Sequence, residues 1–398
     1  MTNNKNVHII SATSFLSGIY LGMLGVIWQP LVLSLGASMS LLGFLESLGG
    51  RHGLVTNLIQ PLGGWLSDYW GRKPLVALGS IIAVLAMVLY LLALGLRDWR
   101  LLIPGITLLG MVGISRPARN SLTAESVQAS KRGMAYSAVM FFLILPGIFA
   151  PALGGFLAHL WGYGIILVSA VTLEGICLAL VFYFLRETIS RPTDPATWRD
   201  LARALTRMVV PPRGFGGFYL AMAGDMFVWG LGPVILFGLL TRTYGFTTAQ
   251  LGIMSSLFSL SWTVSQLPLG KLMDRYGYKR FLILSEIIGL LVIGMWLAFS
   301  SLEAFAASYV LYGLVAATWG PAMLALLANS VSDEERAQAM GTIFAFRGLV
   351  AFPAPYIGGL LFDLAGFRAP LFASFLGVMA VTVAIALLVR EPPREVWT

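Results

Sequence analysis

Long apolar runs, separated by short polar connections, constrain this chain more than any other feature of its sequence. A helix needs about 20 mostly apolar residues to cross the hydrocarbon core of a bilayer. Twelve runs meet that length: 9–34, 40–66, 74–96, 101–124, 134–158, 163–185, 215–240, 248–269, 281–300, 304–329, 339–362 and 369–389. Because the runs are continuous and not alternating, they predict transmembrane helices and exclude barrel strands.

The composition excludes soluble proteins. Hydrophobic residues make up 58% of the 398 residues and charged residues 11%, whereas soluble domains have about 45–50% and about 25%. The net charge of +8 does not indicate nucleic acid, since the basic residues form short clusters between apolar runs and no continuous patch. The first run exceeds the roughly 7–15 apolar residues of a secretory signal, so we expect no cleavable signal peptide.

Residue types that support metal or catalytic sites are scarce. One cysteine, Cys177, excludes a disulfide framework or thiolate cluster. The three histidines, at positions 8, 52 and 159, are scattered, so we expect neither a metal site nor a cofactor. The sequence has no Ser/His/Asp set for an enzyme and no phosphate-binding loop for ATP.

The distribution of Lys and Arg predicts the orientation. If the amino terminus is cytoplasmic, the outer loops hold Arg97, Arg100, Arg242 and Arg368, and four arginines lie within the runs. The remaining 18 of the 26 basic residues then fall inside. We therefore expect a multi-pass protein of the plasma (cell inner) membrane with both termini cytoplasmic.

One long connection separates six runs from six. We expect an N-terminal six-helix bundle over 1–187, a cytoplasmic linker over 188–213, and a C-terminal six-helix bundle over 214–398. In the linker Trp198, Leu201, Leu205 and Met208 recur at helical spacing. This pattern predicts an amphipathic helix on the anionic inner leaflet; a solvated linker helix fits it nearly as well.

The two halves repeat each other in the same orientation, as in duplicated six-span units. The segment Gly64-Trp-Leu-Ser-Asp-Tyr-Trp-Gly-Arg-Lys73 recurs as Gly270-Lys-Leu-Met-Asp-Arg-Tyr-Gly-Tyr-Lys279. Ala-Pro-x-x-Gly-Gly occurs at 150–155 and again at 354–359. Three such patterns in register, including Pro-Ala at 117 and 321, make coincidence implausible.

These segments resemble the major facilitator superfamily, whose signature loop between spans 2 and 3 matches 64–73. The resemblance implies an all-α membrane protein with twelve transmembrane helices in two pseudo-symmetric halves. In that family the loop aspartate caps span 11 and the loop arginine pairs with an acid ending span 4, which implies roles for Asp68, Arg72 and Glu125. The implied conformational latch comprises Gly64, Asp68, Gly71, Arg72, Lys73, Glu125, Asp274, Gly277 and Lys279. A simple tight turn explains the glycines but not the acid and base.

The Ala-Pro-x-x-Gly-Gly segments resemble a motif of the family's proton-coupled drug exporters, which usually has Gly where Ala150 stands. Close helix packing is the alternative explanation. The residues expected in gating and packing are Gly53, Pro151, Gly154, Gly155, Pro355, Gly358 and Gly359. Exporters of that branch often carry an arginine at the position of Ile106, so this chain departs from their pattern of proton coupling.

Ionisable residues within the spans mark further candidate sites, because charge in a bilayer is costly. The candidates for proton or substrate binding are Asp225, Glu46, Arg51, Arg116, Arg119, Glu174 and Arg347; Glu286 is also intramembrane. The resemblance implies that spans 1, 4, 7 and 10 line the cavity, which favours Asp225. A fixed ion pair with an arginine is the alternative. Arg116 and Arg119 are expected to meet an anionic substrate or Glu125.

Span 2 carries a strip of small and polar residues. At 100° per residue, Glu46, Gly49, Gly50, Gly53, Asn57, Gln60 and Gly64 fall within about 60° of one another. We expect this strip to be a close-packing seam against span 11, which carries Arg347.

Together these features predict a monomeric secondary active transporter that moves a small organic solute by alternating access. We expect its partners to be that solute, protons as the coupling ion and the lipid bilayer, and its direction to be export. Uptake or exchange of an organic anion, and a membrane scaffold without transport activity, remain alternatives.

Overall fold

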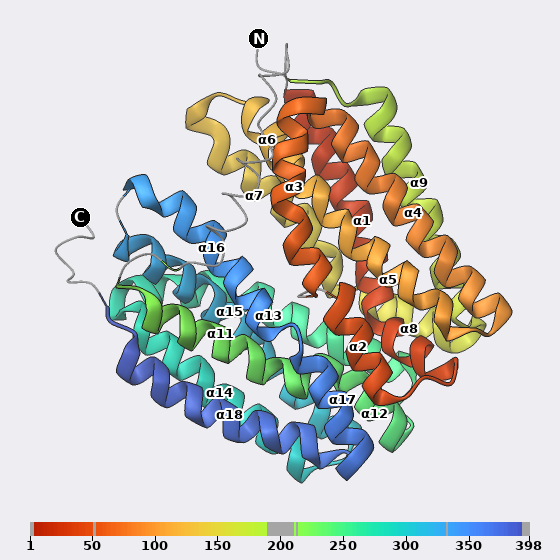
Figure 1. Ribbon diagram of the computed structural model, residues 1–398, viewed down its shortest axis with the longest axis vertical. Coiled ribbons are helices and arrows are strands. Elements are labelled where there is room, and N and C mark those ends of the chain that lie inside the picture. Colours follow the sequence, from red (N-terminus) through yellow and green to blue (C-terminus); the bar gives the residue numbers. More distant parts are fainter. Residues whose placement is uncertain (1–3, 51–52, 189–210, 212–213, 332, 392–398) are drawn as a thin grey trace. The chain divides into compact units, whose positions relative to one another are not determined.

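The computed structural model describes residues 4–50, 53–188, 211, 214–331 and 333–391, without side chains at 4, 61, 68, 333–338 and 340–341. Over these residues the backbone forms α-helices and short 3-10 helices and contains no strand (Figure 1). The expected all-α membrane fold is confirmed.

The described residues of the first half form nine α-helices, some of them joined by short 3-10 turns. Their bounds are α1 (Asn4–Ser34), α2 (Met39–Gly49), α3 (Leu54–Trp70), α4 (Arg72–Leu96), η1 (Trp99–Leu101), α5 (Leu102–Met111), η2 (Val112–Ser115), α6 (Arg116–Glu125), η3 (Ala129–Lys131), α7 (Arg132–Ile144), η4 (Leu145–Ile148), α8 (Ala150–Trp161) and α9 (Tyr163–Phe184).

The second half follows the same plan. It comprises α11 (Gly216–Leu231), η5 (Pro233–Ile235), α12 (Leu236–Tyr244), α13 (Thr248–Tyr276), α14 (Tyr278–Ala298), α15 (Leu302–Ser330), α16 (Asp333–Ala351), α17 (Ala354–Ala365) and α18 (Arg368–Leu388).

Nine helical stretches of the described residues are long and apolar enough to cross a membrane, or ten if the bent pair α7 and α8 counts as one span. The two other predicted spans correspond to α2 with α3, and to the 29-residue α13. Every apolar run of the sequence is therefore helical over most of its length, which is consistent with twelve spans.

Span 2 is not the continuous helix that its sequence predicts. It is broken between the end of α2 at Gly49 and the start of α3 at Leu54, where Gly53 has an extended conformation (φ −65°, ψ 160°). Each glycine in a helix costs up to about 1 kcal/mol relative to alanine. The break is stabilised because the Gly50 carbonyl accepts hydrogen bonds from Gly53 N (2.9 Å) and Thr56 Oγ1 (3.1 Å).

The contacts divide the chain into two compact units. The first contains the described residues of Met1–Ala37, Leu48–Leu205 and Thr247–Gly252; the second contains those of Ser38–Ser47, Thr206–Phe246 and Ile253–Thr398. Each unit therefore includes a short segment from the opposite half of the sequence. The predicted amphipathic linker helix lies outside the described residues.

Within each unit the same helices surround the middle. In the first unit α9 packs along both α4 and α1, and Trp28 of α1 lies against Tyr90 of α4 with ring centroids 4.9 Å apart. In the second unit α14 and α18 pack together, and α11 contacts both α16 and α18. Four intramembrane charged residues lie on these helices: Glu174 on α9, Asp225 on α11, Glu286 on α14 and Arg347 on α16.

Candidate functional site

Three charged residues meet inside the second unit. Asp225 lies on α11, Glu286 on α14 and Arg347 on α16, and they are 4%, 0% and 8% exposed. Arg347 Nη2 lies 3.6 Å from Asp225 Oδ2, an ion pair within the apolar interior. The structure thus joins two of the predicted candidates, Asp225 and Arg347, in one cluster.

The Arg347 guanidinium is held from several sides. Its Nε donates to the carbonyl of Met222 at 3.0 Å, and its Nη1 lies 3.4 Å from Met323 Sδ. Its planar face lies 4.3 Å from the ring of Trp319. A buried guanidinium with a carbonyl, an aromatic face and a carboxylate as partners is well compensated for its loss of water.

Glu286 brings a second carboxyl group to this cluster. Trp229 Nε1 donates to Glu286 Oε2 at 3.5 Å, and the Glu286 carboxyl lies beside that of Asp225. Two neighbouring carboxylates in an apolar interior repel each other, which favours a proton on one of them. Among the described residues, Asp225 Oδ1 and Glu286 Oε1 have no partner of good hydrogen-bond geometry. The cluster is therefore able to bind and release a proton.

Aromatic side chains form one wall beside the acid pair. Trp229 stacks on Tyr312 with ring centroids 5.2 Å apart and planes 4° from parallel, and Tyr312 contacts Phe258 at 5.0 Å. The backbone of Gly289 lies against Trp229, where a Cβ would come within 2.6 Å of the indole. This wall fixes the indole that donates to Glu286.

The first unit has a different charged cluster. Glu174 on α9 is 4% exposed, and the hydroxyls of Ser80, Tyr20 and Ser17 lie close enough to its carboxyl to hydrogen-bond it. Arg119 on α6 acts on the same carboxyl through its charge. The remaining candidates are more dispersed: Arg116 begins α6, Glu46 lies on α2, and Arg51 lies outside the described residues.

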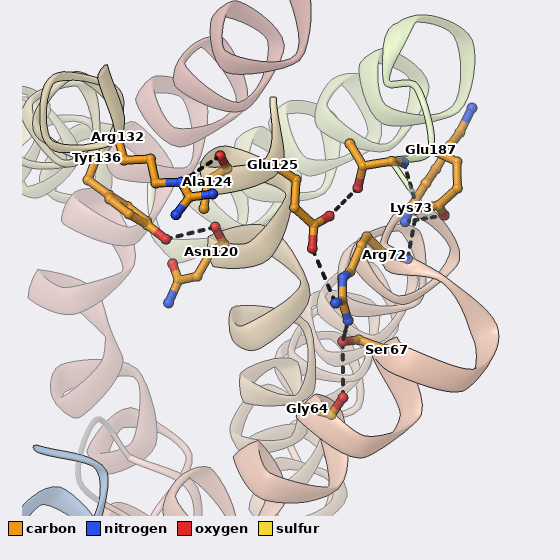
Figure 2. Close-up of polar contacts among 11 residues, drawn as sticks. Gly64, Ser67, Arg72, Lys73, Asn120, Ala124, Glu125, Arg132, Tyr136 and Glu187 are labelled. Atoms are coloured by element: carbon orange, nitrogen blue, oxygen red, sulfur yellow. Dashed lines mark hydrogen bonds and ion pairs between the residues drawn. The ribbon is translucent and has the colours of Figure 1, made fainter. Parts of the chain in front are cut away.

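The loop between spans 2 and 3 forms a polar network within the first unit (Figure 2). Arg72 Nη2 lies 3.3 Å from Glu125 Oε1, and Arg72 Nη1 donates to Ser67 Oγ. Thr188 Oγ1 donates to the other carboxylate oxygen of Glu125. The pair of Arg72 with Glu125 that the family resemblance implies is present. The Asp68 side chain lies outside the described part of the structure.

The same loop is tied to the end of span 6 by a reciprocal arrangement. The Glu187 carboxylate accepts from Arg72 N (3.2 Å) and Lys73 N (3.0 Å), the first amides of α4. In return, Lys73 Nζ donates to the carbonyl of Phe182 (2.8 Å) in the last turn of α9. Both contacts follow the helix dipole, with negative charge at an N-terminus and positive charge at a C-terminus.

The second half repeats this arrangement. Glu391 accepts from Tyr278 N at 2.6 Å, and Lys279 Nζ donates to the carbonyl of Ala386 at 2.7 Å. The two glutamates are missing from the residues that the sequence singled out. An available signal was the Arg-Glu pair at 186–187 and again at 390–391, since the offset of 204 equals that of the other repeats.

The glycines of the two loops have backbone conformations that side chains avoid. Gly71 and Gly277 both have φ of +99°. A Cβ at Gly71 would lie 2.6 Å from the Glu187 carboxylate, and one at Gly277 would lie 2.6 Å from that of Glu391. In contrast, a Cβ at Gly64 would meet its nearest neighbour, Pro117, only at 3.8 Å. Asp274 accepts a hydrogen bond from the Tyr278 hydroxyl at 2.8 Å.

The glycines of the repeated Ala-Pro-x-x-Gly-Gly segments lie in close helix contacts. A Cβ at Gly154 would meet Met23 of α1 at 2.6 Å, and a Cβ at Gly358 would meet the Leu231 carbonyl of α11 at 1.7 Å. The second glycine of each pair faces a short segment that belongs to its unit but comes from the other half of the sequence. Gly155 faces the Thr248 carbonyl (2.2 Å), and Gly359 faces the Met39 carbonyl (2.1 Å).

The two prolines of these segments take part in the same seams. Pro151 lies against Gly252 at the start of α13, and Pro355 against Gly43 of α2. The small residues of each repeated motif thus form a surface against which the beginning of another span packs. That span is span 8 in the first unit and span 2 in the second.

The strip expected on span 2 does not form one continuous surface, because the break between α2 and α3 divides it. Gly49 faces the carbonyl of Ile106 in span 4, where a Cβ would come within 2.0 Å, and Gly53 lies in the helix break. Asn57 Nδ2 donates within its own helix, to the Gly53 carbonyl at 2.9 Å. The break changes the helical phase that the strip assumed. The contact with span 11 is made by Gly43 instead, which lies against the Pro355 carbonyl.

Comparison with known proteins assigns this architecture to a family. The model of the family described as the Major Facilitator Superfamily matches residues 10–237 and 217–398. The chain belongs to the Major Facilitator Superfamily. Its resemblance to the family's drug exporters extends over most of the chain. It is 24% identical to the Multidrug resistance protein MdtG of Salmonella arizonae over 338 residues, which cover 84% of this chain and 80% of that protein. The corresponding protein of Klebsiella pneumoniae is 24% identical over 351 residues, 86% of this chain and 82% of the relative.

Solved structures of this superfamily share the fold at low sequence identity. The nucleoside transporter NupG aligns over 96% of this chain and 98% of its own, with a TM-score of 0.76 and 13% identity. The human organic anion transporter MFSD10 aligns over 97% of this chain and 100% of its own, with a TM-score of 0.67 and 17% identity. The Major Facilitator Superfamily consists of membrane transporters, and this chain is one of them.

Proposed function

We propose that this superfamily member exports a small organic solute across the cell inner membrane in exchange for protons, by alternating access. Membership of the superfamily supports transport, and the multidrug resistance proteins that it resembles support export. The cluster of Asp225, Glu286 and Arg347 is the observation that carries proton coupling. The excess of basic residues in the inner loops supports cytoplasmic termini.

The coupling follows from the charges of the cluster. With one proton between the two carboxyls, the remaining negative charge is neutralised by Arg347, and the buried cluster is neutral. Loss of that proton leaves one uncompensated negative charge in an apolar interior, which is costly until the surroundings change or a ligand arrives. Proton binding and solute binding then depend on each other, which is the linkage that an exchanger requires.

The network of Arg72, Glu125, Glu187 and Lys73 is proposed as a latch on the cytoplasmic side. It ties the beginning of α4 to the end of α6 and to the end of α9. Rearrangement of this side of the transporter would require several charge-assisted hydrogen bonds to break together. The latch therefore stabilises one conformation over another, and its strength sets part of their ratio.

Transport of an organic anion is the second candidate. Arg119 supports it, because its Nε has no hydrogen bond partner among the described residues although it is buried. A free guanidinium N–H is a good donor to a carboxylate or phosphate oxygen. This candidate differs from the first in the solute and not in the protein class.

Counterflow in proteoliposomes tests the proposal. Vesicles that contain the purified protein and a high internal concentration of one compound would receive a trace of the same labelled compound outside. The panel comprises lipophilic organic cations, neutral drugs and organic anions. We expect transient accumulation of at least one compound of the first two groups. Accumulation restricted to anions would support the second candidate, and none throughout the panel, in vesicles where a known exchanger works, would contradict transport.

A further inference from the structure

The carboxyl of Glu174 lies in the middle of a span and does not belong to the cluster of Asp225, Glu286 and Arg347. It is eleven residues from the start of α9 at Tyr163 and ten from its end at Phe184. Its side chain is 4% exposed. An ionisable side chain at this depth is costly and calls for an explanation by its surroundings.

Its surroundings consist of hydroxyl groups. The hydroxyls of Ser17 and Tyr20 from α1 and of Ser80 from α4 lie around the carboxyl, and all three residues are buried. A hydroxyl both donates and accepts a hydrogen bond and rotates to suit its partner. The same three groups can therefore donate to a carboxylate or accept from a protonated carboxyl. The guanidinium and indole groups around Asp225 and Glu286 can only donate.

The positive charge that acts on Glu174 is not fixed to it by an ion pair. Arg119 reaches it from α6 through space, and Glu174 makes no ion pair within 4 Å in the described part of the chain. Arg119 Nε and Glu174 Oε2 both lack a hydrogen bond partner there. The other titratable groups that face the carboxyl are the Tyr20 phenol from α1 and the Cys177 thiol from α9 itself. Glu174 thus has a nearby positive charge without the fixed pairing of Asp225 and Arg347.

The internal repeat shows that this is a separate feature and not a copy of the other cluster. At the offset of 204, Glu174 corresponds to Val378 of α18. At the offset of 206, Glu286 corresponds to Ser80, which is one of the hydroxyls that face Glu174. The carboxyl therefore comes from the sixth span of the first half, α9, but from the third span of the second half, α14.

We propose that Glu174 is a second proton-binding site, in which the hydroxyls of Ser17, Tyr20 and Ser80 satisfy both the charged and the neutral carboxyl. The proton adds to one carboxylate oxygen and leaves from it, and no other bond changes. When it binds, the attraction on Arg119 is lost and that guanidinium is released toward other partners. The site binds its proton whether or not Asp225 is the coupling residue.

Infrared difference spectroscopy of the full-length protein in lipid nanodiscs tests this proposal. The carbonyl band of a protonated carboxyl would be followed between low and high pH in a D225N/E286Q background, so that the other cluster does not contribute. We expect a titrating band that disappears with E174Q. A pH difference spectrum that E174Q leaves unchanged would overturn the proposal, without bearing on transport or on Asp225.

A second set of variants tests the cage without replacing the glutamate. S80A and Y20F each remove one hydroxyl, and we expect each to change the proton affinity reported by the band by about fivefold, the effect of one hydrogen bond. The matched control is S169A on the helix of Glu174, because Ser169 is half-buried and its hydroxyl donates to the Ile165 carbonyl of its own helix. Equal titration in S80A, Y20F and S169A would show that the hydroxyl cage does not hold the proton.

Discussion

Loss of one partner from the buried pair of Asp225 and Arg347 should destabilise the protein far more than loss of both. The two charged atoms are 3.6 Å apart. At an effective dielectric constant of about 20, unit charges at that distance attract by roughly 5 kcal/mol. Removal of one member of a buried ion pair typically costs about 3–5 kcal/mol, because the other charge remains without compensation.

We therefore expect R347M to lower the free energy of unfolding by about 3–5 kcal/mol. The double variant D225N/R347M should regain at least about 2 kcal/mol of that loss, because no uncompensated charge then remains at this pair.

The assay is unfolding of the purified protein in mixed micelles of dodecylmaltoside and increasing sodium dodecyl sulfate, followed by tryptophan fluorescence. R368M serves as the matched control, since Arg368 is exposed, and it should change the stability by about 0.5 kcal/mol or less. Strict additivity of D225N and R347M would contradict this expectation, because it would mean that the two side chains do not interact.

Three further perturbations test the loop and the packing seams. G71A should destabilise the protein by about 1–3 kcal/mol, because a φ of +99° suits only glycine and the added Cβ would meet Glu187. The control G175A adds its Cβ in open space and should not destabilise the protein; thermal melting in detergent compares the two variants. G359L should abolish transport without loss of expression, because a side chain at this position collides with the Met39 carbonyl. G175L should transport normally, and equal transport by both variants would exclude a role for the contact of Gly359 with Met39. R72Q should change the stability by no more than about 1 kcal/mol, because the ion pair of Arg72 with Glu125 is partly exposed. It should increase maleimide labelling of cysteines introduced on the cytoplasmic side, and unchanged labelling would argue against the latch.

The helices of this fold are predictable from the sequence for a simple physical reason. In a bilayer each backbone polar group must be satisfied within its own helix, so a run of about 20 apolar residues has few alternatives. The break of span 2 was not predictable in this way. Its glycines permit both a helix and a break, and the choice depends on contacts such as that of Gly49 with Ile106, which lie far apart in the sequence.

The candidate site was predictable in its residue types but not in its partners. The expense of intramembrane charge singled out Asp225, Glu174 and Arg347. The pairing depends on which faces of α11, α14 and α16 meet, and the sequence left a free Asp225 and a fixed ion pair as equal alternatives. The family resemblance favours spans 1, 4, 7 and 10 and therefore does not single out Glu286 on span 9, yet its carboxyl lies beside that of Asp225.

The latch shows the opposite case, in which a repeat was present and not used. Glu187 and Glu391 follow the last helix of each half. Each lies far along the chain from the loop that it contacts, so no local sequence pattern connects the two. Only the fold brings the end of α9 to the beginning of α4, where the carboxylate meets two free amides. The offset of 204 was the available sequence signal.

The proposed function depends above all on the carboxyl cluster around Asp225, which would couple proton movement to solute movement. The most direct test reconstitutes the wild type and D225N in proteoliposomes and applies a pH gradient with the compound found by counterflow, while a pH-sensitive dye reports proton flux. We expect the wild type to accumulate the compound against its gradient with matching proton movement, and D225N to exchange it downhill only. Uphill accumulation by D225N equal to that of the wild type would show that Asp225 does not couple the two movements.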